Sequence, residues 1–228
     1  MGAIRSVINN FDGSEELAQT QKELITTLAN LAETKAQLFE TQVKQNLLEA
    51  GTKGNQTIPI SRIITSTTET HAYTQESAKL IPDTVQSSLM SFISGGNQDI
   101  LKGVGGLIST AVTAFFGEAS AGNNTLEKYY IITEGLSIVR VDLHAWSLDI
   151  AAQSIKSKLE KVSAFVAVKS AVDVSKLDYN TFLNVYQDQL ASAGISGKVL
   201  DQALAEAHKV YHRFHELSLE KPTHAKQI

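Results

Sequence analysis

The 228-residue sequence contains no cysteine. This absence excludes disulfide bonds, thiolate catalysis and cysteine-ligated zinc or iron–sulfur sites. The twenty lysines and arginines are scattered and the net charge is −4, so the basic surface of nucleic-acid-binding proteins is missing too. No apolar run reaches the roughly 20 residues of a bilayer-spanning helix, and the first thirty residues lack a signal-peptide core. We expect neither nucleic-acid binding nor a conventional integral membrane protein.

The bulk composition is that of a globular chain. Hydrophobic residues make up 43% and charged residues 19% of the sequence, which predicts a single domain spanning residues 1–228. No phosphate-binding loop, dinucleotide fingerprint, HExxH, GxSxG or kinase signature is present. We therefore predict no cofactor, and enzymatic activity is not the preferred expectation.

Residues 14–50 predict a long amphipathic helix, with Ser14 as its N-cap and Gly51 after its end. Leucines recur every seven residues along it, at Leu17, Leu24, Leu31 and Leu38. The polar residues Gln21, Lys35 and Gln42 interrupt the second position that a coiled coil would need. Packing in a helical bundle is therefore favoured, and a homo-oligomer assembled through this helix is an alternative.

Further elements follow from composition and periodicity. A β-branched stretch over residues 57–68 predicts a strand, and alternating apolar residues over 129–146 predict a hairpin. Helices are expected over residues 82–96, 100–117, 149–172, 179–193 and 198–219. The predicted fold class is α+β and predominantly α-helical, a helical bundle with a small antiparallel sheet or hairpin.

One phrase occurs twice, as ETHAYTQESA from Glu69 to Ala78 and as DLHAWSLDIA from Asp142 to Ala151. Both fit [DE]-x-His-Ala-aromatic-[Ser/Thr]-x-[DE]-x-Ala, and each follows a strand-like stretch. The repetition predicts an internal pseudo-twofold of two β-α-α units, residues 57–128 and 129–197. The helices over 14–50 and 198–220 would lie outside these units.

Alternate residues of an extended segment share one face, which groups the side chains of the phrase. The first copy presents Glu69, His71 and Tyr73, and the second presents Asp142, His144 and Trp146. If the two strands pair, the imidazoles and carboxylates would form a composite metal site or a His–carboxylate general base. The alternative is structural: each histidine pairs with its own acid two residues earlier.

The segment Ile100–Gly117 is apolar and unusually rich in small residues. Gly105, Ser109, Thr113 and Gly117 fall four apart, a spacing that lets helices approach closely in lipid. With Phe115 and Phe116, this ridge predicts a lipid- or membrane-contacting helix. The alternative is a central helix buried in a protein core.

Two weaker patterns lie at the ends of the chain. MGAIRS fits the N-myristoylation pattern with Gly2 as the acceptor. His208 and His212 are one helical turn apart and could share a metal ion, although a polar flank of a packed helix is the favoured explanation.

The preferred function is a non-enzymatic membrane- or lipid-interacting protein of the effector, toxin or virulence-factor type. It would be cytoplasmic or peripherally membrane-associated, with delivery out of the cell without a signal peptide left open. One alternative is an enzyme, metal-dependent or using the duplicated His motif. The other is a helical assembly protein.

Overall fold

The computed structural model describes residues 15–73, 87–89, 98–117, 123–134, 137–150 and 159–219. The helices are α2 (Glu15–Glu49), α4 (Gln98–Gly117), α6 (Tyr179–Ser192) and α7 (Gly197–Leu219), and residues 87–89 are also helical. The strands are β1 (Ile60–Tyr73), β2 (Asn123–Glu134), β3 (Ser137–Asp149) and β4 (Lys161–Val172). The helices predicted over 14–50, 100–117, 179–193 and 198–219 are confirmed within the described residues.

The four strands form one sheet in the order β1-β4-β3-β2, and every neighbouring pair is antiparallel. The predicted hairpin is confirmed as β2 and β3, whose last pair is Glu134 with Ser137. The chain returns through β4, which pairs with β3 on one side and with the distant β1 on the other. Strands β1 and β2 are therefore the two edges.

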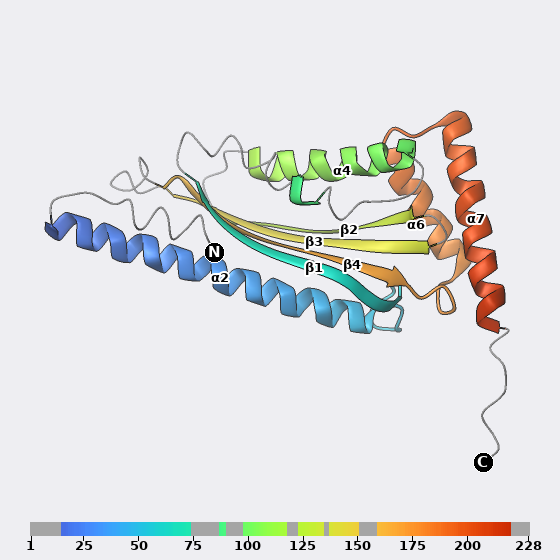
Figure 1. The fold of residues 1–228 in the computed structure, drawn as a ribbon, viewed down its shortest axis with the longest axis horizontal. Helices are drawn as coiled ribbons and strands as arrows, with labels where there is room; N and C mark the ends of the chain where they lie inside the picture. Colours follow the sequence, from blue (N-terminus) through green and yellow to red (C-terminus); the bar gives the residue numbers. More distant parts are fainter. Residues whose placement is uncertain are drawn as a thin grey trace, which may run out of the picture.

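The prediction of a helical bundle with a small hairpin is wrong, because the sheet is a full layer of the fold. Figure 1 shows α2 along one face of the sheet, α4 over the opposite face, and α6 and α7 at one end. Strands of 12 to 14 residues supply the core surface on which these helices pack. The protein is an α+β sandwich with a central sheet.

The helix predicted over residues 149–172 is also wrong where it overlaps β4. Val162, Phe165 and Val166 fit a helical stripe, yet in the strand Val162 and Val166 face α2 while Phe165 packs on the opposite side. A strand covered on both faces reads as a nearly continuous apolar run, and such a run does not distinguish strand from buried helix.

The expected pair of β-α-α units is not present in the sheet. Within the described residues, the first copy of the repeated phrase occupies the last five residues of edge strand β1, and the second runs from Asp142 to the end of the inner strand β3 at Asp149. Strand β4, not a helix pair, is the next described element after β3. In the second predicted unit, residues 161–172 are therefore a strand where a helix was expected, and residues 74–86, 90–97 and 151–158 of the two units lie outside the described residues.

Two apolar clusters hold the layers together. Helix α2 packs a row of apolar residues against the sheet: Ile25, Ala29, Ala32, Ala36, Phe39, Val43 and Leu47. On the other face, α4 packs Val104, Ile108, Val112 and Phe116 into a second cluster that continues onto α6 and α7. The spacing of three or four residues in α2, and of four in α4, matches one face of an α-helix.

Polar side chains fix two ends of this arrangement. The buried Lys161 ammonium of β4 donates to the Phe116 carbonyl at the end of α4 (2.9 Å) and pairs with Asp149 (3.2 Å). A cation at this place complements the negative end of the helix. At the β2 edge, the Gln189 amide bonds both the N–H and the C=O of Ile131 at 2.6 Å, which closes part of the open edge.

Candidate functional site

The two copies of the repeated phrase do not meet. Strand β4 separates β1 from β3, and the register sets His71 opposite Ser163 but Trp146 opposite Ala164. His71 stacks near Phe165 in the α4-side cluster, whereas Trp146 belongs to the α2-side cluster. Because the two sets lie on opposite faces of the sheet, the geometry does not support the predicted composite site.

The first set forms a closed pair on the α4 side. His71 Nε2 lies 2.9 Å from Glu69 Oε2, and the imidazole stacks on Tyr73 with ring centroids 5.5 Å apart. Burial lowers the pKa of His71 although Glu69 opposes the shift, and burial raises the pKa of Tyr73. In this copy the histidine does pair with its own acid two residues earlier, as the structural alternative expected.

In the second set the acid, Asp142, pairs with Arg140 and not with the histidine. Asp142 accepts hydrogen bonds from Arg140 Nε and Nη2 at 2.7 to 3.1 Å, and both side chains are buried. Burial raises the pKa of Asp142, and the hydrogen bonds from Arg140 oppose that shift. Sequence reasoning missed Arg140, although its alternation with Asp142 along the strand was a usable signal.

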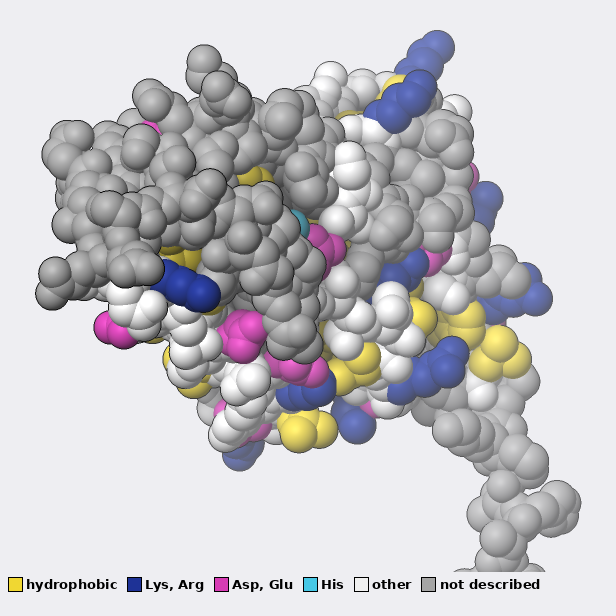
Figure 2. Space-filling view, turned by 60° about the vertical axis from the view of Figure 1, so that its left-hand side comes forward, with side chains coloured by type: hydrophobic (Ala, Val, Ile, Leu, Met, Phe, Trp, Pro, Cys, Tyr) yellow, Lys and Arg dark blue, Asp and Glu magenta, His cyan; other side chains and the backbone are white. Residues whose placement is uncertain are grey.

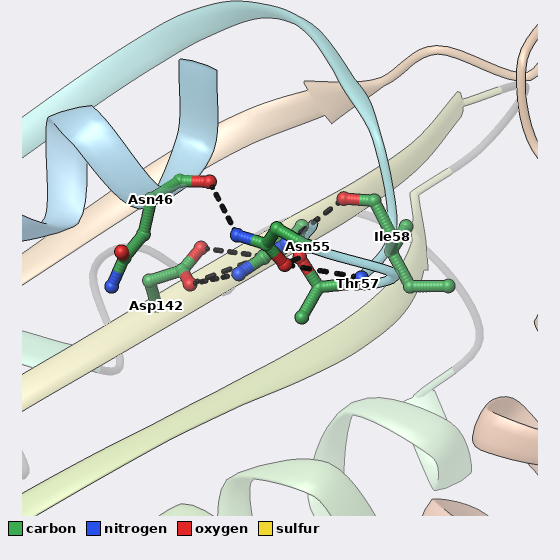
Figure 3. Close-up of polar contacts among 6 residues, drawn as sticks. Asn46, Asn55, Thr57, Ile58 and Asp142 are labelled. Carbon is green, nitrogen blue, oxygen red and sulfur yellow. Dashed lines mark hydrogen bonds and ion pairs between the residues drawn. The ribbon is translucent and has the colours of Figure 1, made fainter. Parts of the chain in front are cut away.

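Arg140 also holds the connection between α2 and β1. Its Nη1 donates to the Thr57 hydroxyl at 3.0 Å and to the Ile58 carbonyl at 2.8 Å. Asn55 extends the network by donating to the Asn46 carbonyl and accepting from Thr57, as Figure 3 shows. The α2–β1 connection is thereby tied to β3 through a buried guanidinium.

His144 has a different environment from His71. Its ring meets Phe39 of α2 edge-on at 5.8 Å, and its buried Nδ1 makes no hydrogen bond within the described part of the chain. The nearest acid, Glu127 on β2, lies 3.9 Å from Nδ1, beyond hydrogen-bond distance. Burial lowers the pKa of His144 while Glu127 opposes the shift, so the imidazole is neutral at pH 7.

A pocket of about 260 Å³ opens over these groups. Its lining includes Asn46 of α2, Glu127 and Tyr129 of β2, and Asp142 and His144 of β3. The Tyr129 ring lies 4.3 Å from the Arg140 guanidinium and so forms one side of the same polar cluster. We name these residues the His144 pocket. It contains two residues of the second predicted set and none of the first.

Trp146, the third residue of the second set, has a packing role. Its side chain is fully buried beneath α2, and the Lys35 ammonium lies 6.0 Å from its ring centroid. That contact explains why a lysine is tolerated within the apolar flank of the helix.

The small-residue ridge of α4 lies partly against the protein. Gly105 is buried, Ser109 is half-buried and Thr113 is exposed. Phe116 is buried and Phe115 is half-buried, and Gly117 is the last residue of the helix. Within the described residues, no helix combines the length and the apolar character needed to cross a bilayer. Lipid contact by α4 stays a prediction.

The remaining predicted sites are on α7 and at the N-terminus. His208 and His212 have ring centroids 4.2 Å apart, and His208 Nδ1 lies 2.7 Å from the Tyr179 hydroxyl. The described ranges hold no group of three or more His, Asp or Glu residues suited to a metal ion. Gly2 lies outside the described residues.

A second surface site, which sequence reasoning missed, lies where the end of α2 meets the start of β1. A groove of about 420 Å³ has one aliphatic side formed by Leu47, Leu48, Pro59, Ile60 and Ile63. Three cations also line it, namely Lys44, Arg62 and Lys176. Leu48 is 84% exposed and the neighbouring Ile64 is 45% exposed. We name it the corner groove. It depends on a contact between segments that local patterns do not reveal.

Figure 2 shows hydrophobic side chains lying directly beside lysine and arginine side chains on the lower part of the molecule.

No protein-family model matches the chain, and a comparison with curated proteins found no match. The function is therefore argued from the corner groove and the His144 pocket.

Proposed function

We propose that this protein is a non-enzymatic, peripheral membrane-binding protein that contacts an anionic lipid surface through the corner groove. The observation that carries the proposal is the exposure of Leu48, at 84%, beside the groove cations. One exposed leucine is ordinary on a protein surface, but Leu48 lines the same groove as the exposed Ile63, and contiguous exposed apolar groups mark interaction sites.

The apolar contribution is substantial for so small a patch. Complete burial of a leucine or isoleucine side chain is worth about 1.5–3 kcal/mol. Leu48, Ile63 and Ile64 are all exposed and lie on adjoining elements, the end of α2 and the start of β1. Their insertion among lipid headgroups and upper acyl carbons would remove most of this surface from water.

The cations supply the preference for an anionic surface. Arg62 is exposed and makes no hydrogen bond or ion pair with any described residue, while Lys44 pairs with Glu40 and Lys176 pairs with Asp173. Exposed pairs of this kind are worth only about 0–1 kcal/mol, so a lipid phosphate can replace the carboxylate. Each cation near an anionic membrane contributes about 1 kcal/mol.

These apolar and electrostatic contributions predict weak, reversible binding to an anionic membrane. A single myristoyl chain is also only a marginal anchor, and stable attachment takes two signals. Acylation at Gly2, where the sequence pattern allows it, would combine with the corner groove. The two signals together would hold the protein at the membrane.

The test is co-sedimentation of the full chain with phosphatidylcholine vesicles and with vesicles containing 30% phosphatidylserine. We expect binding to the anionic vesicles that falls at least tenfold in the Leu48→Ser, Ile63→Ser double variant. Leu217→Ser is the matched control, since Leu217 is 52% exposed on α7, away from the groove. Arg62→Glu should weaken binding to anionic vesicles only.

The same assay separates the corner groove from α4. Thr110→Glu with Ala114→Glu adds two charges to exposed positions of α4 without entering the core. Loss of binding in this variant, with the Leu48→Ser, Ile63→Ser variant unchanged, would move the membrane contact to α4. Absence of binding by the wild-type chain to both vesicle types would overturn the proposal.

A further inference from the structure

The His144 pocket and the His71 pair differ in the distance between the histidine nitrogen and the neighbouring glutamate oxygen. On the α4 side, Glu69 Oε2 lies 2.9 Å from His71 Nε2, so that nitrogen has a hydrogen-bond partner. On the α2 side, Glu127 stops 3.9 Å from His144 Nδ1, and that nitrogen is buried with no hydrogen bond to any described residue. A buried polar atom without a partner costs about 1–3 kcal/mol, so such an atom facing a pocket indicates a missing partner.

The two groups at the centre of the argument, Glu127 and His144 Nδ1, can both act as hydrogen-bond acceptors. Each guanidinium nitrogen of Arg140 already donates to a protein oxygen, and Asn55 and Thr57 bond to each other. What remains is the Glu127 carboxylate and, in the neutral imidazole, the lone pair that Nδ1 carries in one tautomer. Lys128 also lines the pocket, but its partner on β3 is Leu143, which packs in the α4-side cluster, so strand alternation directs the Lys128 side chain to that face. Because Asp142 is matched by Arg140, Glu127 leaves the α2 face of the pocket with one negative charge that a cation would balance.

The spacing suits one donor atom that serves both acceptors. Two acceptors 3.9 Å apart can each lie about 2.9 Å from a single nitrogen placed between them, and an ammonium carries enough N–H groups for both. The pocket volume of about 260 Å³ lies just below the usual range for ligand sites of about 300–1,000 Å³, which limits the ligand to a few carbon atoms beyond the amine.

We propose that the His144 pocket binds a small organic primary amine, whose ammonium group bridges His144 Nδ1 and the Glu127 carboxylate. Asn46 and the Tyr129 ring contact the rest of the molecule. The pocket lies on the opposite flank of α2 from the corner groove, since Phe39 reaches His144 on β3 while Leu48 faces β1. It is therefore a second, independent binding site.

The experiment uses the full chain labelled with ¹⁵N-histidine. Putrescine and n-butylamine are titrated as probes, with 1-butanol as the neutral counterpart. We expect a saturable shift of the His144 Nδ1 resonance, assigned with the His144→Gln variant, and no matching shift of His71. Glu127→Gln should weaken amine affinity at least tenfold. Glu127 is 55% exposed, so this variant keeps the fold.

Glu69→Gln is the matched control, because it removes the same charge beside the other histidine. Equal weakening by Glu69→Gln and Glu127→Gln would show non-specific attraction and overturn the proposal. It would also be overturned if millimolar amine left the His144 resonance unchanged, which would mean that only water fills the gap. A response to 1-butanol equal to that of n-butylamine would show that charge is not recognised and would have the same effect.

Discussion

Arg140 and Asp142 lie two residues apart on β3, on the same face of the sheet, and the guanidinium binds both carboxylate oxygens at 2.7 to 3.1 Å. Both side chains are buried, and Arg140 also bonds the Ile58 carbonyl before β1 begins. A contact between close neighbours in sequence thereby anchors a segment more than eighty residues away. It also forms the polar floor of the His144 pocket.

Replacing Arg140 alone should strongly lower the unfolding free energy. Arg140→Met leaves the Asp142 carboxylate buried without its cation, and breaking a buried pair in this way costs about 3–5 kcal/mol of unfolding free energy. The Arg140→Met, Asp142→Leu double variant should lose less, because no charge is then left unpaired. Urea unfolding measures both.

Lys44→Met is the control for this comparison. Lys44 and Glu40 form an exposed pair at 2.6 Å, which is worth less than about 1 kcal/mol. An Arg140→Met variant as stable as Lys44→Met would show that the buried pair does not hold the fold.

The two buried histidines predict a loss of stability in mild acid. Burial lowers the pKa of both His71 and His144 in the folded protein. As the pH falls below about 6.5, the pKa of an unfolded histidine, protons therefore bind the unfolded chain more readily than the folded chain. Their stabilising contribution is complete above that pH and declines as the pH falls from 6.5 toward 5. We expect His71→Gln and His144→Gln each to flatten this decline in urea unfolding measured from pH 7.5 to 5. Slopes equal to that of the wild-type chain would contradict the assignment.

Two glycines of α4 should respond oppositely to the same change. A Cβ at Gly106 meets no atom within 4 Å, so Gly106→Ala should stabilise the protein by about 0.5–1 kcal/mol through helix propensity. A Cβ at Gly103 would lie 2.5 Å from Ile195 Cδ1, so Gly103→Ala should lose that gain or destabilise the protein. Thermal unfolding of the two variants tests this, and a Gly103→Ala variant as stabilised as Gly106→Ala would contradict the close contact between α4 and the α6–α7 connection.

The seven-residue leucine repeat predicts self-association through α2. Leu24, Leu31 and Leu38 are exposed. The hydroxyls of the exposed threonines at 27, 34 and 41 donate to the carbonyls four residues earlier, so they are already used within the helix. We expect concentration-dependent association in analytical ultracentrifugation that the Leu24→Ser, Leu31→Ser variant abolishes without unfolding. Lys22→Ser, elsewhere on the exposed surface of the same helix, is the control. A wild-type chain that stays monomeric throughout would remove the assembly alternative.

Local signals predicted the elements whose period is strong and unambiguous. The helix from Glu15 to Glu49 and the two final helices follow from apolar periodicity, and the first also from Gly51 after its end. The β2–β3 hairpin follows from alternation around Gly135. The absence of cysteine excluded thiolate chemistry without any structure.

The sheet and both sites were decided by tertiary structure. Residues Lys161–Val172 are a strand because α2 covers one face and the α4-side cluster covers the other, and a run buried on both faces carries no period to read. His71 and His144 share a local phrase, yet the strand order sends them to opposite faces, and only one is closed by a carboxylate. The corner groove joins residues of α2 with residues after a turn at Gly51. The sequence by itself determined the helices with a strong apolar period and the chemistry that is absent. Long-range strand pairing decided that residues 161–172 form a strand and which side chains meet, because contacts across a sheet depend on neighbours that no local pattern records.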